Sequence, residues 1–95
     1  MQVEHELTMT AVCPMDDSQD FYTVFIRLSK VIPVEILKAT LGGMSGVKVF
    51  QEELTQLLAN RFECEVETRG IHSGVKTKAV CTPSNVPLVI DKEAK

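Results

Sequence analysis

Cys13 and Asp20 are the residues whose types and spacing most directly suggest chemistry. A thiolate is a strong nucleophile, and a carboxylate can take or give a proton. Only residues 14–19 separate the two side chains, so they would lie at the ends of one tight loop if the flanking segments pair as strands. The alternative is structural, because a cysteine that ends a buried strand is commonly an inert small hydrophobic residue. We treat Cys13 and Asp20 as candidate catalytic residues.

The segments on either side of this loop have the pattern of strands. Residues 2–13 alternate between apolar and polar side chains, with Cys13 in phase with the apolar positions, which is typical of a half-buried strand. Pro14 cannot donate a ladder hydrogen bond and is expected to end that strand. A second strand is expected over roughly residues 21–29.

Two helices and two further strands are expected after these. A first helix should cover roughly residues 33–41 and end at Gly42-Gly43, and a second should cover roughly residues 46–61 with Ser45 as its N-cap. The later elements are a strand at 62–69, a hairpin loop at 70–74, a strand at 75–82 and a tail at 83–95 that contains a short apolar run, residues 86–90.

The order ββααββ predicts an α+β fold in which a four-stranded antiparallel sheet carries two helices on one face. We expect a single domain over residues 1–82, followed by the tail. The open edges of so small a sheet need cover, and pairing between copies of the chain into a homo-oligomeric ring is one solution.

Composition narrows the functional class. The chain has 95 residues, 44% of them hydrophobic, and a net charge of −3 without a run of Lys or Arg. No membrane partner and no direct DNA binding are therefore expected. The three cysteines, at positions 13, 64 and 81, form no disulfide framework and are expected to be reduced thiols of a cytoplasmic protein, with Cys64 and Cys81 in the core.

Several motifs resemble a known group of proteins. Val12-Cys13-Pro14 followed by Asp20-Phe21 resembles the Cys-Pro…Asp-Phe pattern of the 7-cyano-7-deazaguanine reductases and their short relatives, the archaeosine-forming amidinotransferases. The run Phe50-Gln51-Glu52-Glu53 resembles the Phe-His-Glu-Asp run that opens their second helix. These proteins share the tunnelling fold with GTP cyclohydrolase I. Gln51-Glu52 also resembles the Gln-Glu pair of that enzyme.

The resemblance implies a specific chemistry. Cys13 would add to the nitrile carbon of 7-cyano-7-deazaguanine and form a thioimide, Asp20 would transfer the proton, and Glu52 would bind the guanine-like edge. The resulting function is modification of a 7-deazaguanine nitrile in queuosine- or archaeosine-type tRNA nucleoside biosynthesis. The alternatives are an NADPH-dependent reductase and a non-catalytic protein that binds a purine- or pterin-like molecule.

Two departures from these families bear on cofactors. The reductases carry Glu-Ser-Lys-Ser-Leu-Lys for NADPH, whereas here Glu35 is followed by Ile36-Leu37-Lys38. We therefore expect no cofactor, and NADPH only under the reductase alternative. GTP cyclohydrolase I binds zinc through a Cys-x-x-His, but Asp16 occupies the histidine position, so no metal is expected.

Three further residues are candidates for substrate binding: Glu52, Gln51 and His72. On a helix from residue 46, Glu52 would point away from the apolar stripe, which suits a solvated surface residue or a site at a subunit boundary, with Cys13 from one chain and Glu52 from its neighbour. His72, expected in the hairpin loop, is either an acid–base group or an ordinary exposed histidine.

Overall fold

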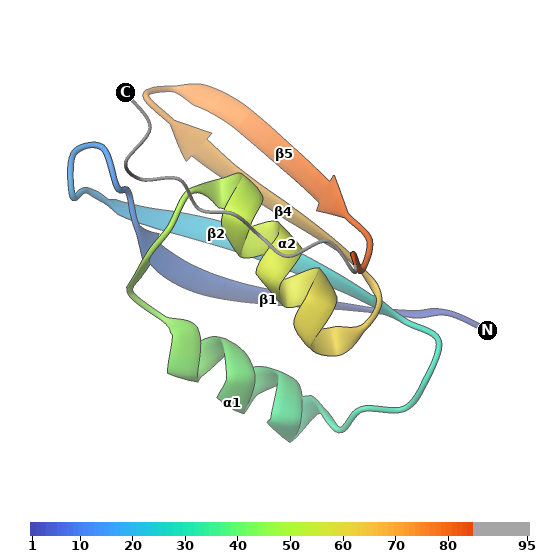
Figure 1. Ribbon diagram of the computed structural model, residues 1–95. Coiled ribbons are helices and arrows are strands. Elements are labelled where there is room, and N and C mark those ends of the chain that lie inside the picture. The colour runs from blue at the N-terminus through green and yellow to red at the C-terminus, as the bar shows by residue number, and fades with distance from the viewer. Residues whose placement is uncertain (85–95) are drawn as a thin grey trace.

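The alternating segment at the N-terminus forms strand β1, Val3–Val12. The computed structural model describes residues 1–84, in which a five-stranded sheet has the order β3-β1-β2-β4-β5 (Figure 1). The other elements are β2 at Gln19–Leu28, α1 at Val34–Met44, β3 at Val47–Lys48, α2 at Gln51–Phe62, β4 at Glu65–His72 and β5 at Val75–Cys81. Of the helices within this part of the chain, none is long and apolar enough to cross a membrane.

Both helices lie on one face of the sheet, as Figure 1 shows. The core between the helices and the sheet is built from alternate strand residues, such as Val24 and Ile26, and from helix leucines, all nearly inaccessible to solvent: Leu37, Leu41, Leu54 and Leu58. This arrangement follows from the two sequence periods, two in the strands and 3.6 in the helices, which direct one side of every element inward. The α+β fold with two helices on one face is confirmed.

The expectation of four antiparallel strands was wrong in one detail. Residues 47–48 form a short strand, β3, that pairs parallel to β1 at Ala11 and Val12. Gly46, with φ of 82°, turns the chain out of α1, and its N–H donates to the carbonyl of Thr10 at 3.0 Å. The second helix therefore begins at Gln51 rather than Gly46, because residues 46–49 find their hydrogen bonds along β1.

Three other boundaries differ from the expectation. Gly42 and Gly43 continue α1 instead of ending it, and Ser45 is its C-cap rather than the N-cap of α2. Strand β4 runs to His72, so the turn contains only Ser73 and Gly74. Both turn residues have positive φ, 49° and 81°, which matches the twist of a two-residue hairpin. The short apolar run expected at residues 86–90 lies outside the described residues.

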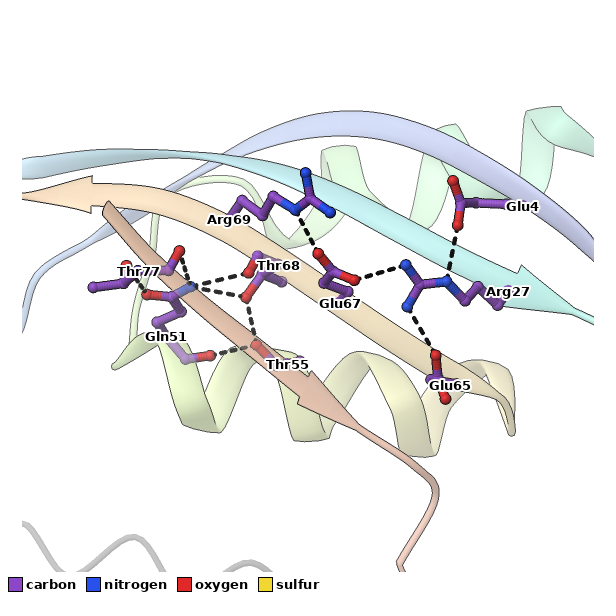
Figure 2. Close-up of polar contacts among 9 residues, drawn as sticks. All are labelled: Glu4, Arg27, Gln51, Thr55, Glu65, Glu67, Thr68, Arg69 and Thr77. Carbon is purple, nitrogen blue, oxygen red and sulfur yellow. Dashed lines mark hydrogen bonds and ion pairs between the residues drawn. The ribbon is translucent and has the colours of Figure 1, made fainter. Parts of the chain in front are cut away.

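The sheet face that carries no helix is covered by charged side chains, which Figure 2 shows. Arg27 on β2 donates to Glu4 at 2.8 Å, to Glu65 at 2.8 Å and to Glu67 at 2.6 Å. Arg69 pairs with the other oxygen of Glu67 and lies over the ring of Phe25, 4.6 Å from its centroid. Burial raises the pKa of Glu67, but the two guanidinium groups more than compensate and hold it below 4.5. Glu67 is thus an ionised carboxylate that is only 4% exposed.

We predict that Glu67→Gln lowers the free energy of unfolding by about 3 kcal/mol at neutral pH, since it removes the buried carboxylate that pairs with both Arg27 and Arg69. Because the pKa of Glu67 in the folded chain lies below 4.5, its contribution is complete above that pH and is lost as pH falls. Glu67→Gln should therefore also flatten the acid limb of stability against pH. Urea unfolding across a pH series measures both effects.

Glu65→Gln is the matched control, because Glu65 contacts the same arginine but its side chain is 39% exposed. An exposed ion pair contributes less than about 1 kcal/mol. Equal losses in the two variants would show that burial of Glu67 does not govern the network.

Candidate functional site

One end of the sheet brings together the loop between β1 and β2, the β4–β5 hairpin and the first turn of α2 (Figure 1). A cavity of about 530 Å³ lies there, within the size range of small-molecule sites. Its lining contains all five candidate residues from the sequence: Cys13, Asp20, Gln51, Glu52 and His72. Cys13 and His72, 59 positions apart in the chain, thus line one cavity.

The loop that carries Cys13 is closed by its own hydrogen bonds. The N–H of Cys13 donates to the carbonyl of Ser18 at 2.8 Å, and the N–H of Asp17 donates to the carbonyl of Cys13 at 2.9 Å. Asp16 accepts from the N–H and hydroxyl of Ser18, and these bonds, with a smaller effect from the Cys13 thiol, lower the pKa of the Asp16 carboxyl. The loop therefore holds the half-buried thiol against an ionised, exposed carboxylate.

Asp20 lies at the start of β2 in a cluster with Tyr22 and His72. The Tyr22 hydroxyl donates to Asp20 Oδ2 at 3.4 Å and lies 3.2 Å from His72 Nε2. His72 Nδ1 is 3.6 Å from Asp20 Oδ1. Burial and the Asp20 charge raise the pKa of Tyr22 well above its ordinary 10.0, so the hydroxyl keeps its proton. His72 is a half-buried strand residue, which corrects its expected place in an exposed loop.

Gln51 is the first residue of α2 and is only 7% exposed. Its side-chain nitrogen donates to the carbonyls of Thr68 and Thr77 at 3.2 and 3.4 Å (Figure 2). Its side-chain oxygen accepts from the Thr77 hydroxyl at 2.6 Å and lies 3.2 Å from His72 Nε2. The amide is therefore occupied by contacts within the chain.

Glu52, the next helix residue, is exposed and lines the cavity that contains Cys13. Its outward direction agrees with the sequence expectation. A single chain also brings Glu52 and Cys13 to one cavity. The lining also contains Lys78, which adds a positive group to a cavity that holds the carboxylates of Asp20 and Glu52.

Sequence reasoning missed Tyr22 and Thr77 as members of this site. Tyr22 lies two positions after Asp20 in β2, and residues two apart in a strand point to the same face. This spacing could have predicted that the two side chains lie together. Thr77 is opposite Gly70 in the β4–β5 register, and its position depends on the hairpin turn that was expected elsewhere. Both residues line the cavity.

The other two cysteines are structural, as expected. Cys64 belongs to the core and Cys81 packs against it. Burial raises the pKa of both thiols, which lowers their reactivity at neutral pH.

A second hollow, of about 520 Å³, lies mainly on the opposite sheet face. Exposed Phe21 and Ile71 form its apolar part, and Arg69, Lys76 and Lys78 supply positive charge. Its lining contains no thiol. The candidate nucleophile, Cys13, lies in the first cavity, which is therefore the candidate site. Within residues 1–84, no group of three or more His, Cys, Asp or Glu side chains is arranged to hold a metal ion.

The fold and the cavity together define an α+β protein with a thiol, a carboxylate and an imidazole at one end of a mixed sheet. A similar arrangement of the chain occurs in a solved structure described as the archaeosine synthase QueF-Like in the apo form. The two chains superimpose with a TM-score of 0.80 at 21% sequence identity, over 90% of this chain and 96% of that one. This likeness confirms the fold expected from the resemblance to the tunnelling-fold group. No protein-family model and no curated protein sequence matches the chain.

We predict that Gly70→Ala disturbs the site through Tyr22. An added Cβ at position 70 would lie 2.8 Å from two carbons of the Tyr22 ring, so the ring must move. Such overpacking costs about 1–3 kcal/mol, measurable by urea unfolding. In a Tyr22→Val background, which removes the obstructing ring, Gly70→Ala should cost much less. An equal loss in both backgrounds would contradict this account of why β4 contains a glycine.

Proposed function

We propose that the chain modifies the nitrile of 7-cyano-7-deazaguanine, as an amidinotransferase-like enzyme of queuosine- or archaeosine-type tRNA nucleoside biosynthesis. The observation that carries this proposal is the single cavity that contains Cys13, Asp20 and Glu52. The likeness in fold to an archaeosine synthase supports the same substrate class. Cys13 lies in the loop after β1, Asp20 in β2 and Glu52 in α2. The fold is what brings these three residues into one cavity.

The first step would be addition of the Cys13 sulfur to the nitrile carbon. A nitrile is a modest electrophile, which a polarizable sulfur nucleophile suits. As the carbon–sulfur bond forms, one electron pair of the carbon–nitrogen triple bond moves to nitrogen, which takes a proton. Asp20 is the carboxyl group in the cavity whose hydrogen bonds to neighbouring side chains make it suitable for this transfer. The product is a thioimide that keeps every atom of the ligand.

Release would follow when ammonia or an amine adds to the thioimide carbon and the thiol departs. This exchange produces an amidine and returns Cys13 to its starting form. It consumes no reductant, in keeping with the absence of the reductase Lys- and Ser-bearing run after Glu35.

Glu52 would hold the ligand. A carboxylate accepts two hydrogen bonds from the adjacent N–H groups of an aminopyrimidinone, which gives geometric selectivity for guanine-like rings. Its place in the first turn of α2, beside the cavity and exposed to solvent, leaves both oxygens available to an incoming molecule.

We predict that incubation with 7-cyano-7-deazaguanine adds the full ligand mass to the protein under denaturing conditions, as detected by mass spectrometry. Cys13→Ala should abolish the adduct. Cys64→Ala and Cys81→Ala are the matched controls and should keep it, because both thiols pack in the core. Glu52→Gln should weaken ligand binding by about 10- to 100-fold, the effect of losing a charge-assisted hydrogen bond.

Two outcomes would select the alternatives. Tight binding without any gain in mass would favour a non-catalytic binding protein. Loss of NADPH absorbance that depends on both the nitrile and Cys13 would favour a reductase.

We also propose that the chain assembles into a homo-oligomer with sites near subunit boundaries. Strand β3 covers β1 only at Ala11 and Val12, and within the described residues no strand pairs with the outer edge of β5. Unpaired edges are templates for pairing with another copy. Light scattering at working concentrations should give a mass several times the 10.5 kDa of one chain, and a stable monomer would contradict this assembly.

A further inference from the structure

The amide of Gln51 has only one orientation that satisfies its neighbours. Its Nε2 lies within hydrogen-bond distance of two backbone carbonyls, Thr68 O at 3.2 Å and Thr77 O at 3.4 Å. Carbonyls only accept hydrogen bonds, so the NH₂ group must face them. The Gln51 Oε1 atom must then face the Thr77 hydroxyl and His72 Nε2.

The neighbouring threonines agree with this orientation. Thr55 Oγ1 donates to the carbonyl of Gln51 at 2.7 Å, so its own oxygen is available to accept from Thr68 Oγ1, 2.7 Å away. Thr68 Oγ1 then accepts from Gln51 Nε2 at 3.2 Å. The two N–H groups of Gln51 are thus shared among three acceptors, and every oxygen in this buried network has a donor within hydrogen-bond distance (Figure 2).

This orientation determines which nitrogen of His72 carries a proton. Gln51 Oε1 is an acceptor 3.2 Å from Nε2, and the pairing is favourable only when Nε2 bears hydrogen. Nδ1 is left facing Asp20 Oδ1 at 3.6 Å. A lone pair on Nδ1 would repel a carboxylate there, whereas a proton on either atom would make the contact attractive.

Tyr22 completes the assignment on the Asp20 side. Its hydroxyl donates to Asp20 Oδ2 at 3.4 Å, which leaves Oδ1 for the imidazole. The Tyr22 oxygen can in turn accept from the Nε2–H of His72, 3.2 Å away. The other charged or titratable groups in the cavity lining are Cys13, Glu52 and Lys78, and within residues 1–84 none of them forms a hydrogen bond or ion pair with the imidazole.

We propose that Asp20 and His72 share one proton and act together as the acid that serves Cys13, with Gln51 as the residue that positions the imidazole. This inference rests on the proposed function and deepens it. During addition, sulfur bonds to the nitrile carbon, nitrogen takes the shared proton, and the thiol proton replaces it on the pair. No atom is lost and the pair returns to its starting charge. Gln51 thus has a positioning role in place of the substrate contact expected from the sequence.

The first test needs no ligand. NMR of ¹⁵N-histidine-labelled protein reports which ring nitrogens are protonated, and the chain contains only two histidines, so His5→Gln leaves one signal to assign. We expect His72 to bear hydrogen on Nε2 at every pH where the chain is folded. A neutral form with hydrogen on Nδ1 alone would overturn the proton assignment.

The second test separates acid help from general disturbance. Asp20→Asn and His72→Gln should each slow adduct formation with 7-cyano-7-deazaguanine by about 10²–10⁴-fold, the usual weight of proton transfer from a positioned group. The double variant should be no slower than about the worse single variant, because the two residues act as one unit. His72→Gln retains an N–H donor for the Gln51 oxygen, which limits the structural change.

Alkylation of Cys13 by iodoacetamide is the matched control reaction, because this electrophile needs no proton. Both variants should slow alkylation far less than adduct formation and keep it within about tenfold of wild type, because alkylation requires no protonated nitrogen and the thiol proton can leave to water. Equal slowing of both reactions, or wild-type adduct rates in His72→Gln, would overturn the shared role. If the wild-type chain binds the nitrile but forms no adduct, the covalent function fails, and the NMR result still decides where the proton lies.

Discussion

The site depends on one set of hydrogen bonds, those by which the Gln51 side-chain amide joins the start of α2 to the β4–β5 hairpin. Its two N–H groups and its oxygen contact Thr68, Thr77 and His72. These bonds fix the start of α2 against the sheet, so the exposed Glu52 that follows is directed into the same cavity as Cys13. A buried amide with all its partners satisfied is rigid, since leaving any one of them unpaired costs about 1–3 kcal/mol.

The two faces of the sheet solve different problems. The helix-covered face buries apolar side chains and forms the core. The open face has no helix over it, yet it contains the nearly buried carboxylate of Glu67. Its negative charge is compensated there by Arg27 and Arg69, which replace the water that would hydrate an exposed carboxylate. A polar network of this kind shields the middle of β2 and β4 without an apolar patch that would invite non-specific association.

Much of this arrangement could be predicted from the sequence. Period-two alternation placed Cys13 at the point where β1 ends, and the short loop returns the chain so that Asp20 pairs with Ala11, two residues before Cys13. The errors came where local signals competed with long-range contacts. Gly70 reads as a turn residue, yet it pairs with Thr77 in the β4–β5 ladder, and a glycine is needed there because the Tyr22 ring occupies the space of a side chain. Residues 46–49 fit a helical stripe, but pairing with β1, 36 or 37 positions earlier in the chain, holds them out of the helix. Contacts between residues far apart in the sequence leave no local pattern. The hydrogen-bond partners of His72 are contacts of this kind, and so they could not be predicted from the sequence.

The two-residue turn at Ser73-Gly74 has a consequence for how such a chain can change over time. Because successive strand residues alternate between faces, the turn sets the phase that sends His72 and Thr77 into the cavity and Lys76 to the other side. Replacing individual side chains leaves that phase intact, so a lineage can drift far in sequence and still keep the fold. Inserting or deleting one residue in β4 or β5 inverts the whole hairpin at once. The number of residues in β4 and β5 is therefore under tighter constraint than the types of residue they contain. A comparison of motifs alone does not reveal this.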